Sequence, residues 1–276
     1  MSLPIWIVRL IKFGFPYRFS IARLSKVPLL GKIIKYLFFH EDKIILLPQN
    51  KTVKLKIKID IAEDFENIVL PSQIVKHFIE QSNYHFIMNF CICRDSAHCS
   101  DYPIHLGCLF LGRGVLDINP KLGRLVSKKD ALEHIRQCQD AGLVHLIGRN
   151  KLDKIWLGVR HGHQLLTICN CCPCCCLWKM LPYLGRQISS NVTRMPGVRV
   201  EVTICRCTGC GTCTQGTCFV DAIHLENNVA VISEECRGCG RCVSICPNNA
   251  IEMRIDNQVD FVRDSIDRIA PLVDLI

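Results

Sequence analysis

Residues 207–247 read CTGCGTCTQGTCFVDAIHLENNVAVISEECRGCGRCVSICP, and the eight cysteines in this stretch decide the fold of the region around them. They form two runs, which are Cys207-x2-Cys210-x2-Cys213-x4-Cys218 and Cys236-x2-Cys239-x2-Cys242-x3-Cys246-Pro247. Three thiolates at this spacing can bind three corners of an iron–sulfur cubane from one short loop. Zinc ribbons use pairs of cysteines, not triplets followed by a distant fourth, so the spacing favours iron–sulfur clusters over zinc.

The region from about residue 200 to residue 255 resembles the bacterial-type ferredoxin that carries two 4Fe-4S clusters. The resemblance implies that the fourth cysteine of each run binds the cluster of the other run. One cluster would be bound by Cys207, Cys210, Cys213 and Cys246, and the other by Cys236, Cys239, Cys242 and Cys218. The first run departs from the pattern, because it has four residues before its last cysteine and Phe219 replaces the proline. We expect a small bulge at 214–217.

The composition places limits on compartment and partners. Twenty cysteines in 276 residues, many at metal-binding spacing, do not look like the framework of a secreted disulfide protein, which is typically much shorter. Clustered thiolates are easily oxidised, so we expect a reducing compartment, the cytoplasm of an anaerobe. The formal net charge is +9, but seven basic residues and no acidic one lie in residues 1–40, which leaves about +2 for the rest. Bulk charge therefore does not indicate nucleic-acid binding.

Residues 1–47 form a basic, apolar arm that is interrupted by Pro4, Pro16 and Pro28. No apolar run in the arm approaches the ~20 residues that are needed to span a bilayer. Between residues 29 and 39, lysines occupy one side of a helical pattern and apolar residues occupy the other. Such a helix can lie in a membrane interface, on the inner face of the membrane. It can also dock on the body of this protein or on a partner subunit, and the sequence leaves these interpretations open.

Ten further cysteines form two groups in the middle of the chain. They are Cys91, Cys93, Cys99, Cys108, Cys169, Cys171, Cys172, Cys174, Cys175 and Cys176. Six cysteines in eight residues are not needed for packing and would be liable to oxidation without a ligand. We therefore predict a metal site that draws its ligands from both groups. Because adjacent side chains point in different directions, either two clusters share the ten thiols or one unusual cluster uses five or more.

Three charged or ionisable residues lie beside these cysteines. Arg94 follows Cys93 and is a candidate to stabilise an anionic cluster or substrate, the alternative being a surface arginine or an ion-pair partner. His98 and His105 flank Cys99 and are candidates for a ligand or a proton donor. The sequence does not assign a catalytic residue.

The pattern of apolar residues predicts both strands and helices. We predict strands at 53–61, 84–93 and 143–147, and helices at 71–82 and 127–140. Ser127 and Asp130 form a capping box at the start of the second helix, and Gly142 ends it. This helix, glycine and strand are similar to a winged-helix fragment. The expected fold class is α+β, with a mixed cysteine-rich N-terminal and central domain followed by a small ferredoxin-like C-terminal domain.

We expect four segments along the chain. They are a basic amphipathic arm at 1–47, a cysteine-rich α+β domain with a further cluster site at 48–199, a two-cluster ferredoxin domain at 200–256 and a C-terminal helix that closes on it at 257–276. The motifs CICR, GLVH and CNCCPCCC ahead of the ferredoxin unit resemble uncharacterised iron–sulfur proteins of anaerobic archaea and bacteria. That resemblance covers about 70–255 and implies one modular redox unit without naming a substrate.

These patterns predict an iron–sulfur electron-transfer protein or an oxidoreductase subunit. Two 4Fe-4S clusters would exchange single electrons with one or two further clusters at 91–176 and with redox partner proteins. The sequence leaves open whether the inner site itself reduces a substrate. A redox-sensing regulator and a cluster-delivery protein are the alternatives. The helix at 128–140 carries acidic as well as basic residues, which argues against DNA as a partner.

Overall fold

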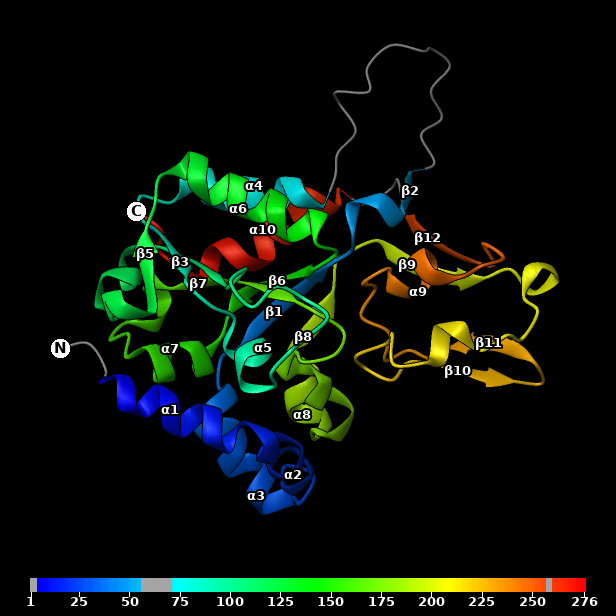
Figure 1. The fold of residues 1–276 in the computed structure, drawn as a ribbon, viewed down its shortest axis with the longest axis horizontal. Helices are drawn as coiled ribbons and strands as arrows, with labels where there is room; N and C mark the ends of the chain where they lie inside the picture. The colour runs from blue at the N-terminus through cyan, green and yellow to red at the C-terminus, as the bar shows by residue number, and fades with distance from the viewer. Residues whose placement is uncertain (1–3, 56–70, 257–259) are drawn as a thin grey trace, which may run out of the picture.

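The computed structural model describes residues 4–55, 71–256 and 260–276. A large sheet with helices on both faces makes up most of the molecule, and a small lobe lies at one end of it (Figure 1). The small lobe contains residues 198–256 and the short strand β2 (Val53–Leu55). Helices and mixed sheets occur together, as expected for the α+β class.

The large sheet has seven strands in the order β5-β3-β4-β7-β6-β1-β8. Their bounds are β1 Lys43–Leu47, β3 His85–Met88, β4 Leu109–Leu111, β5 Gly123–Leu125, β6 Val144–Arg149, β7 Leu166–Cys171 and β8 Val192–Arg194. All neighbours are antiparallel except β1 and β8. Strand β1 falls within the expected arm, yet it pairs with β6 near the middle of the chain.

Side chains alternate between the two faces of the sheet, and this alternation positions the cysteines of β7. Leu166 and Ile168 face a core formed with the helices α4 (Ser72–Gln81), α6 (Lys128–Asp140) and α10 (Phe261–Ile269). Cys169 and Cys171 belong to the core on the opposite face. The alternation in β7 therefore brings two thiols of the cysteine-rich segment to the same face.

The opposite face is covered by the arm and by short helices. They are α1 (Ile5–Gly14), α2 (Arg18–Leu24), α3 (Pro28–Ile34), a π-helical turn at Lys35–Phe39, α5 (Ile92–Ser96), α7 (Lys151–Leu157), η8 (Leu177–Tyr183) and α8 (Arg186–Ser189). Lys12 forms an ion pair with Asp95, and the Nζ of Lys26 donates to the carbonyl of Pro182 over 3.1 Å. In the described part of the chain, no helix is long and apolar enough to cross a membrane.

The small lobe is built from two short sheets. Strand β12 (Ile251–Ile255) pairs antiparallel with β9 (Val198–Val202) and parallel with β2, while β10 (Ile223–Glu226) and β11 (Val229–Ile232) form a hairpin. Helix α9 (Arg241–Ile245) follows the second cysteine triplet and packs on β12. In Figure 1 this lobe occupies the side of the molecule opposite to the label N.

Several predicted elements are confirmed, and others are corrected. The capping box holds, since the Asp130 amide donates to the Ser127 hydroxyl over 3.1 Å and α6 ends at Asp140. The predicted strand at 84–93 ends early, because the chain turns after Met88 and places Cys93 on a helix. The strand predicted at 53–61 is present as β2, and its residues 56–61 lie outside the described part of the chain.

One tertiary expectation was wrong. The helix–glycine–strand unit is not a winged helix, because β6 lies between β7 and β1 inside the seven-stranded sheet. The C-terminal helix α10 packs on α4. Its Phe261 and Ile269 enter a core that also contains Val198, Met253 and Ile255 of the small lobe.

Candidate metal centres

The eight cysteines of the two runs line two separate cavities in the small lobe. The first cavity is lined by Cys207, Cys210, Cys213 and Cys246. The second cavity is lined by Cys218, Cys236, Cys239 and Cys242. Each cavity thus takes three cysteines from one run and the last cysteine from the other. The structure brings together the same two sets of four that the resemblance implied.

Backbone amides point at the sulfurs of both cavities. Cys207 accepts a hydrogen bond from Ala230 N over 3.4 Å, and Cys246 accepts one from Ala250 N over 3.3 Å. In the second cavity, Gly238 N donates to Cys236 and Ala222 N donates to Cys218, each over 3.3 Å. Hydrogen bonds to the charged form stabilise a thiolate, which is the form that binds metal.

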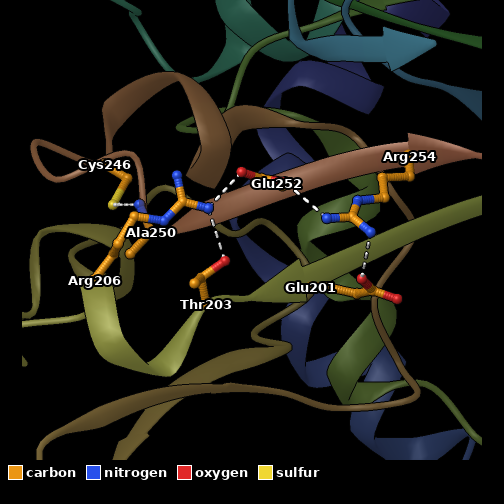
Figure 2. A network of polar contacts seen from close by, with 7 residues as sticks. All are labelled: Glu201, Thr203, Arg206, Cys246, Ala250, Glu252 and Arg254. Atoms are coloured by element: carbon orange, nitrogen blue, oxygen red, sulfur yellow. Dashed lines mark hydrogen bonds and ion pairs between the residues drawn. The ribbon is translucent and has the colours of Figure 1, made fainter. Parts of the chain in front are cut away.

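A polar network holds the first cavity against the sheet of the small lobe (Figure 2). Arg206, which precedes Cys207, donates to the hydroxyl of Thr203 over 2.9 Å and to the carboxylate of Glu252. Arg254 donates to the other oxygen of Glu252 over 3.1 Å. Glu252 on β12 therefore fixes the entry to the first cysteine run, while Ala250, two residues earlier, is bonded to Cys246.

The cysteines of the middle region separate into two centres, and the larger is a cavity of about 260 Å³. We call it the six-thiol cavity, after Cys91, Cys93, Cys108, Cys169, Cys171 and Cys176, which line it. These residues come from α5, β7 and the segments beside β4 and η8. Ile11, Phe15 and Phe38 of the arm complete its wall. Cys172 also lines this cavity, although it belongs to the second of the two inner centres.

Neighbouring thiols in the six-thiol cavity shift each other's pKa in opposite directions. A hydrogen bond from Cys93 lowers the pKa of Cys91 to about 7, despite burial. Hydrogen bonds with Cys169 and Cys176 hold the pKa of Cys171 well below its ordinary value. Hydrogen bonds with Cys108 and Cys171, together with burial, raise the pKa of Cys169 well above its ordinary value. The hydrogen bond with Cys171 and burial do the same for the pKa of Cys176. The arrangement favours thiolates at two of the six sulfurs before any metal binds.

Arg94 is fully buried beside this cavity. Its Nη1 donates to the carbonyl of Asn170 over 2.8 Å, its Nη2 donates to the carbonyl of Leu106, and its Nε has no partner among the described residues. Burial would lower the pKa of the guanidinium, but the charges of the surrounding cysteines outweigh burial and raise it. A surface position, one of the two interpretations of this residue, is wrong. A buried cation of this kind requires a buried anion nearby.

The second inner centre is compact. The sulfurs of Cys99, Cys172, Cys174 and Cys175, which we call the tetrad, all lie within 4.8 Å of one another. The Sγ atom of Cys174 lies 3.6 Å from that of Cys99 and 3.5 Å from that of Cys175. Cys99 follows α5 and the other three form the turn after β7, so both predicted groups of cysteines contribute to the tetrad.

Arg241 connects the second cavity to the six-thiol cavity, and sequence reasoning did not single it out. It is buried, it lines the second cavity, and its Nη2 donates to the backbone carbonyl of Cys171. Its Nε and Nη1 have no hydrogen-bond partner among the described residues. Its position directly after Cys239 and Gly240 in the second run was the signal in the sequence that could have identified it.

The remaining predicted residues lie at the edge of these centres. His105 borders a shallow surface hollow beside Cys99, and neither it nor His98 lines the six-thiol cavity. Cys138 is buried on α6 and packs in the small core around Cys172 and Cys175. Cys205 is exposed and borders neither cavity of the small lobe.

Comparison with known proteins agrees with this geometry over part of the chain. The family model of the LdpA Fe-S cluster-binding domain matches residues 214–256, which include Cys218 and the whole second run. No curated protein and no solved structure matches the chain. The family match and the clustered thiols define an iron–sulfur protein that binds at least one such cluster.

Proposed function

We propose that this protein is an electron-transfer component, alone or as an oxidoreductase subunit. Two 4Fe-4S clusters in the small lobe would exchange single electrons with a further cluster in the six-thiol cavity. The observation that carries the proposal is the sorting of the eight cysteines into two cavities of four, three from one run and one from the other. A single structural zinc needs no second cavity and no exchange of the fourth cysteine between runs.

The packing between the centres supports an order for the relay. Cys213 of the first cavity and Cys242 of the second belong to one small core, so these two cavities are neighbours. Cys218, Cys236 and Cys239 pack against the core that contains Cys171 and Cys176 of the six-thiol cavity. The second cavity is therefore the middle of three centres. The first cavity and the six-thiol cavity lie at its two ends.

Exposure indicates where a redox partner approaches. Cys210 in the first cavity is exposed, whereas the cysteines of the six-thiol cavity are buried or half-buried beneath the arm. A soluble electron carrier would reach the first cavity most closely. Arg94 and Arg241 place two buried cations against the inner thiols, and such cations favour the more negative, reduced state of a bound group.

The test is the iron and sulfide content of protein purified without oxygen, combined with EPR of the reduced sample. We expect more than about eight irons per chain, because two four-iron clusters account for only eight. Cys210→Ser should remove about four irons from the small lobe, and Cys108→Ser should remove iron from the inner cavity only. Cys205→Ser, an exposed cysteine outside both cavities of the lobe, is the control.

Two results would contradict the proposal. A wild-type content of about eight irons, unchanged by Cys108→Ser, would show that no cluster occupies the six-thiol cavity. Fewer than about eight irons, with no coupled EPR signal, would remove the pair of clusters in the small lobe. Reoxidation of the inner cluster by a small molecule without a partner protein would show that the chain is itself an enzyme and not a relay.

A further inference from the structure

We infer that the tetrad of Cys99, Cys172, Cys174 and Cys175 binds a single zinc ion, as a centre separate from every iron–sulfur site of the chain. Four thiolates in a closed tetrahedron are a common structural zinc site. The inference does not depend on electron transfer, and it divides the ten inner cysteines into a group of four and a group of six.

The distances between sulfurs carry the inference. Zinc–sulfur bonds of about 2.3 Å in a tetrahedron place the four sulfurs about 3.8 Å apart. Two pairs in the tetrad, Cys99–Cys174 and Cys174–Cys175, lie 3.6 Å and 3.5 Å apart. No pair exceeds 4.8 Å. Four sulfurs this close surround one ion, and they leave no room for several irons with bridging sulfides between them.

The other cysteines of the molecule provide an internal comparison. Among residues 4–55, 71–256 and 260–276, no other set of three or more potential metal ligands meets the same 4.8 Å limit. Some thiols of the six-thiol cavity are paired by hydrogen bonds, but neither that cavity nor the two cavities of the small lobe contain three or more ligand atoms that all lie so close together. Wide spacing suits a polynuclear cluster, because several metal atoms separate its outer thiolates.

The surroundings of the tetrad fit a structural ion. The Cys175 amide donates to the sulfur of Cys172 over 3.3 Å. Leu106, Cys138 and Leu143 form an apolar core beside it. An ion there would tie the segment after α5 to the turn after β7. That tie would hold Cys171 and Cys176, on either side of the turn, toward the six-thiol cavity.

The experiment counts zinc and iron in the same anaerobic preparation of the full chain. We expect about one zinc per chain in the wild type, lost in Cys99→Ser and retained in the exposed control Cys205→Ser. The iron content per chain should equal that of the wild type, within experimental error, in both variants. In Cys108→Ser the opposite pattern is expected, with zinc retained and iron reduced. This pattern separates failure of the zinc site from failure of the proposed relay.

X-ray absorption at the zinc edge of the wild type keeps the test independent of how the variants fold. Four sulfurs at about 2.3 Å and no iron neighbour would support the inference. Absence of zinc from protein supplied with both metals would overturn it. Loss of several irons, instead of zinc, from Cys99→Ser would also overturn it, because the tetrad would then belong to an iron–sulfur cluster.

An independent observation concerns the arm, whose outer face is apolar and exposed. Thirteen large apolar side chains between residues 6 and 38 are exposed. They are Trp6, Leu10, Phe13, Tyr17, Ile21, Leu24, Val27, Leu29, Leu30, Ile33, Tyr36, Leu37 and Phe38. Phe13 retains 75% and Leu29 retains 71% of its accessible surface. So many exposed apolar side chains on one short segment mark an interaction surface.

We propose that this face of the arm lies on an anionic phospholipid bilayer. Seven basic residues and no acidic residue occur in residues 1–40. Lys12 is paired with Asp95, and the other six basic residues leave the arm with a positive charge that complements anionic headgroups. Trp6, Tyr17 and Tyr36 are exposed on the arm, and such rings favour the interface between headgroups and acyl chains. The short helices of the arm can lie in that interface without crossing it.

Vesicle flotation of the full protein tests this second proposal. We expect binding to vesicles that contain phosphatidylglycerol, and at least tenfold weaker binding to pure phosphatidylcholine. Phe13→Glu combined with Leu29→Glu should abolish binding, whereas Leu116→Glu, an exposed leucine outside the arm, should not. Unchanged binding in the double variant would overturn the proposal. A stable dimer that is lost in the double variant, without vesicle binding, would instead show that the arm contacts protein.

Discussion

The guanidinium of Arg241 donates a hydrogen bond to the backbone carbonyl of Cys171. Arg241 follows Gly240 at the start of α9 and lines the second cavity, while Cys171 ends β7 and lines the six-thiol cavity. One side chain therefore spans the wall between two thiol-lined centres. Its charge acts on both. Burial raises the pKa of Cys239, and the charge of Arg241 offsets part of that rise. Hydrogen bonds with Cys169 and Cys176 hold the pKa of Cys171 well below its ordinary value, and the charge of Arg241 lowers it further.

We predict that Arg241→Gln lowers the reduction potential of the group bound in the second cavity. Removal of a nearby positive charge disfavours the reduced, more negative state. A shift on the order of 60 mV corresponds to a tenfold change in a one-electron equilibrium. Potentiometric titration followed by EPR measures it. Arg254→Gln, on β12 outside the cavities, is the matched control, and equal potentials in both variants would contradict the prediction.

Arg94→Met should have a larger effect on the loaded protein than on the metal-free protein. With an anionic cluster in the six-thiol cavity, loss of the buried guanidinium leaves that charge uncompensated, at a cost of about 3–5 kcal/mol. We therefore expect lower iron content in the inner cavity. In metal-free protein the variant removes a buried cation, so the free energy of unfolding should not fall by that amount.

Iron analysis and denaturant unfolding of both forms check the Arg94 prediction. Arg160→Met, an exposed arginine paired with Asp117, serves as the control for a change of arginine to methionine. Equal iron content in Arg94→Met and the wild type would show that the inner thiols need no counter-cation. Similar destabilisation of the metal-free form would show instead that Arg94 acts through its hydrogen bonds to Asn170 and Leu106.

The sequence predicted the grouping of the eight cysteines in the small lobe because their spacing is local. Three ligands from one loop come together without long-range folding, and the exchange of the fourth was implied by the resemblance to two-cluster ferredoxins. The extra residue before Cys218 is accommodated at Gly216, which adopts a left-handed conformation with φ of +69°. Local spacing was therefore sufficient for the three cysteines of each triplet, but not for the fourth.

The division of the ten inner cysteines could not be predicted in the same way. Residues 169–176 contain six cysteines, and which of them face the six-thiol cavity depends on where β7 ends and on the turn at Pro173. Cys99 reaches the tetrad only because the chain leaves the expected strand at Met88 and forms α5. The position of Arg241 between two centres likewise depends on how the small lobe packs on the large sheet, and no local pattern encodes that packing.

Two equivalent glycines of the cysteine runs should respond differently to alanine. Gly211 and Gly240 both have left-handed backbones, with φ of +74° and +83°, so alanine at either costs about 1–2 kcal/mol in strain. A methyl group at Gly211 meets nothing closer than 3.6 Å, whereas one at Gly240 would approach the Thr52 hydroxyl to 2.2 Å. That hydroxyl donates to the Gln49 carbonyl over 2.8 Å and cannot move without breaking the bond.

We therefore expect Gly240→Ala to lose its cluster more readily than Gly211→Ala. The rate at which visible absorbance is lost in the presence of an iron chelator compares the two variants directly. Gly240→Ala combined with Thr52→Ser keeps the hydroxyl and removes a methyl group, so it should recover only part of the loss. Equal rates for the two single variants would show that backbone strain alone decides retention.

Asp42 should make the protein less stable as the pH rises through neutrality. This carboxyl is buried, its Oδ2 has no partner among the described residues, and burial raises its pKa to about 7 from an ordinary value of 3.8. Between these values the folded protein holds a proton that the unfolded chain has released. The stabilisation is complete below pH 3.8 and is lost as the pH rises through about 7.

Asp42→Asn removes this titration while the side-chain oxygen can still accept from the Lys151 amide, as Oδ1 does over 2.7 Å. Between pH 5 and pH 8, we expect the free energy of unfolding of the variant to rise relative to that of the wild type, by on the order of 2–4 kcal/mol. Denaturant unfolding at several pH values measures the difference, with the exposed Asp267→Asn as control. Parallel pH profiles for the Asp42 variant and the wild type would mean that Asp42 is ionised in the folded protein throughout this range.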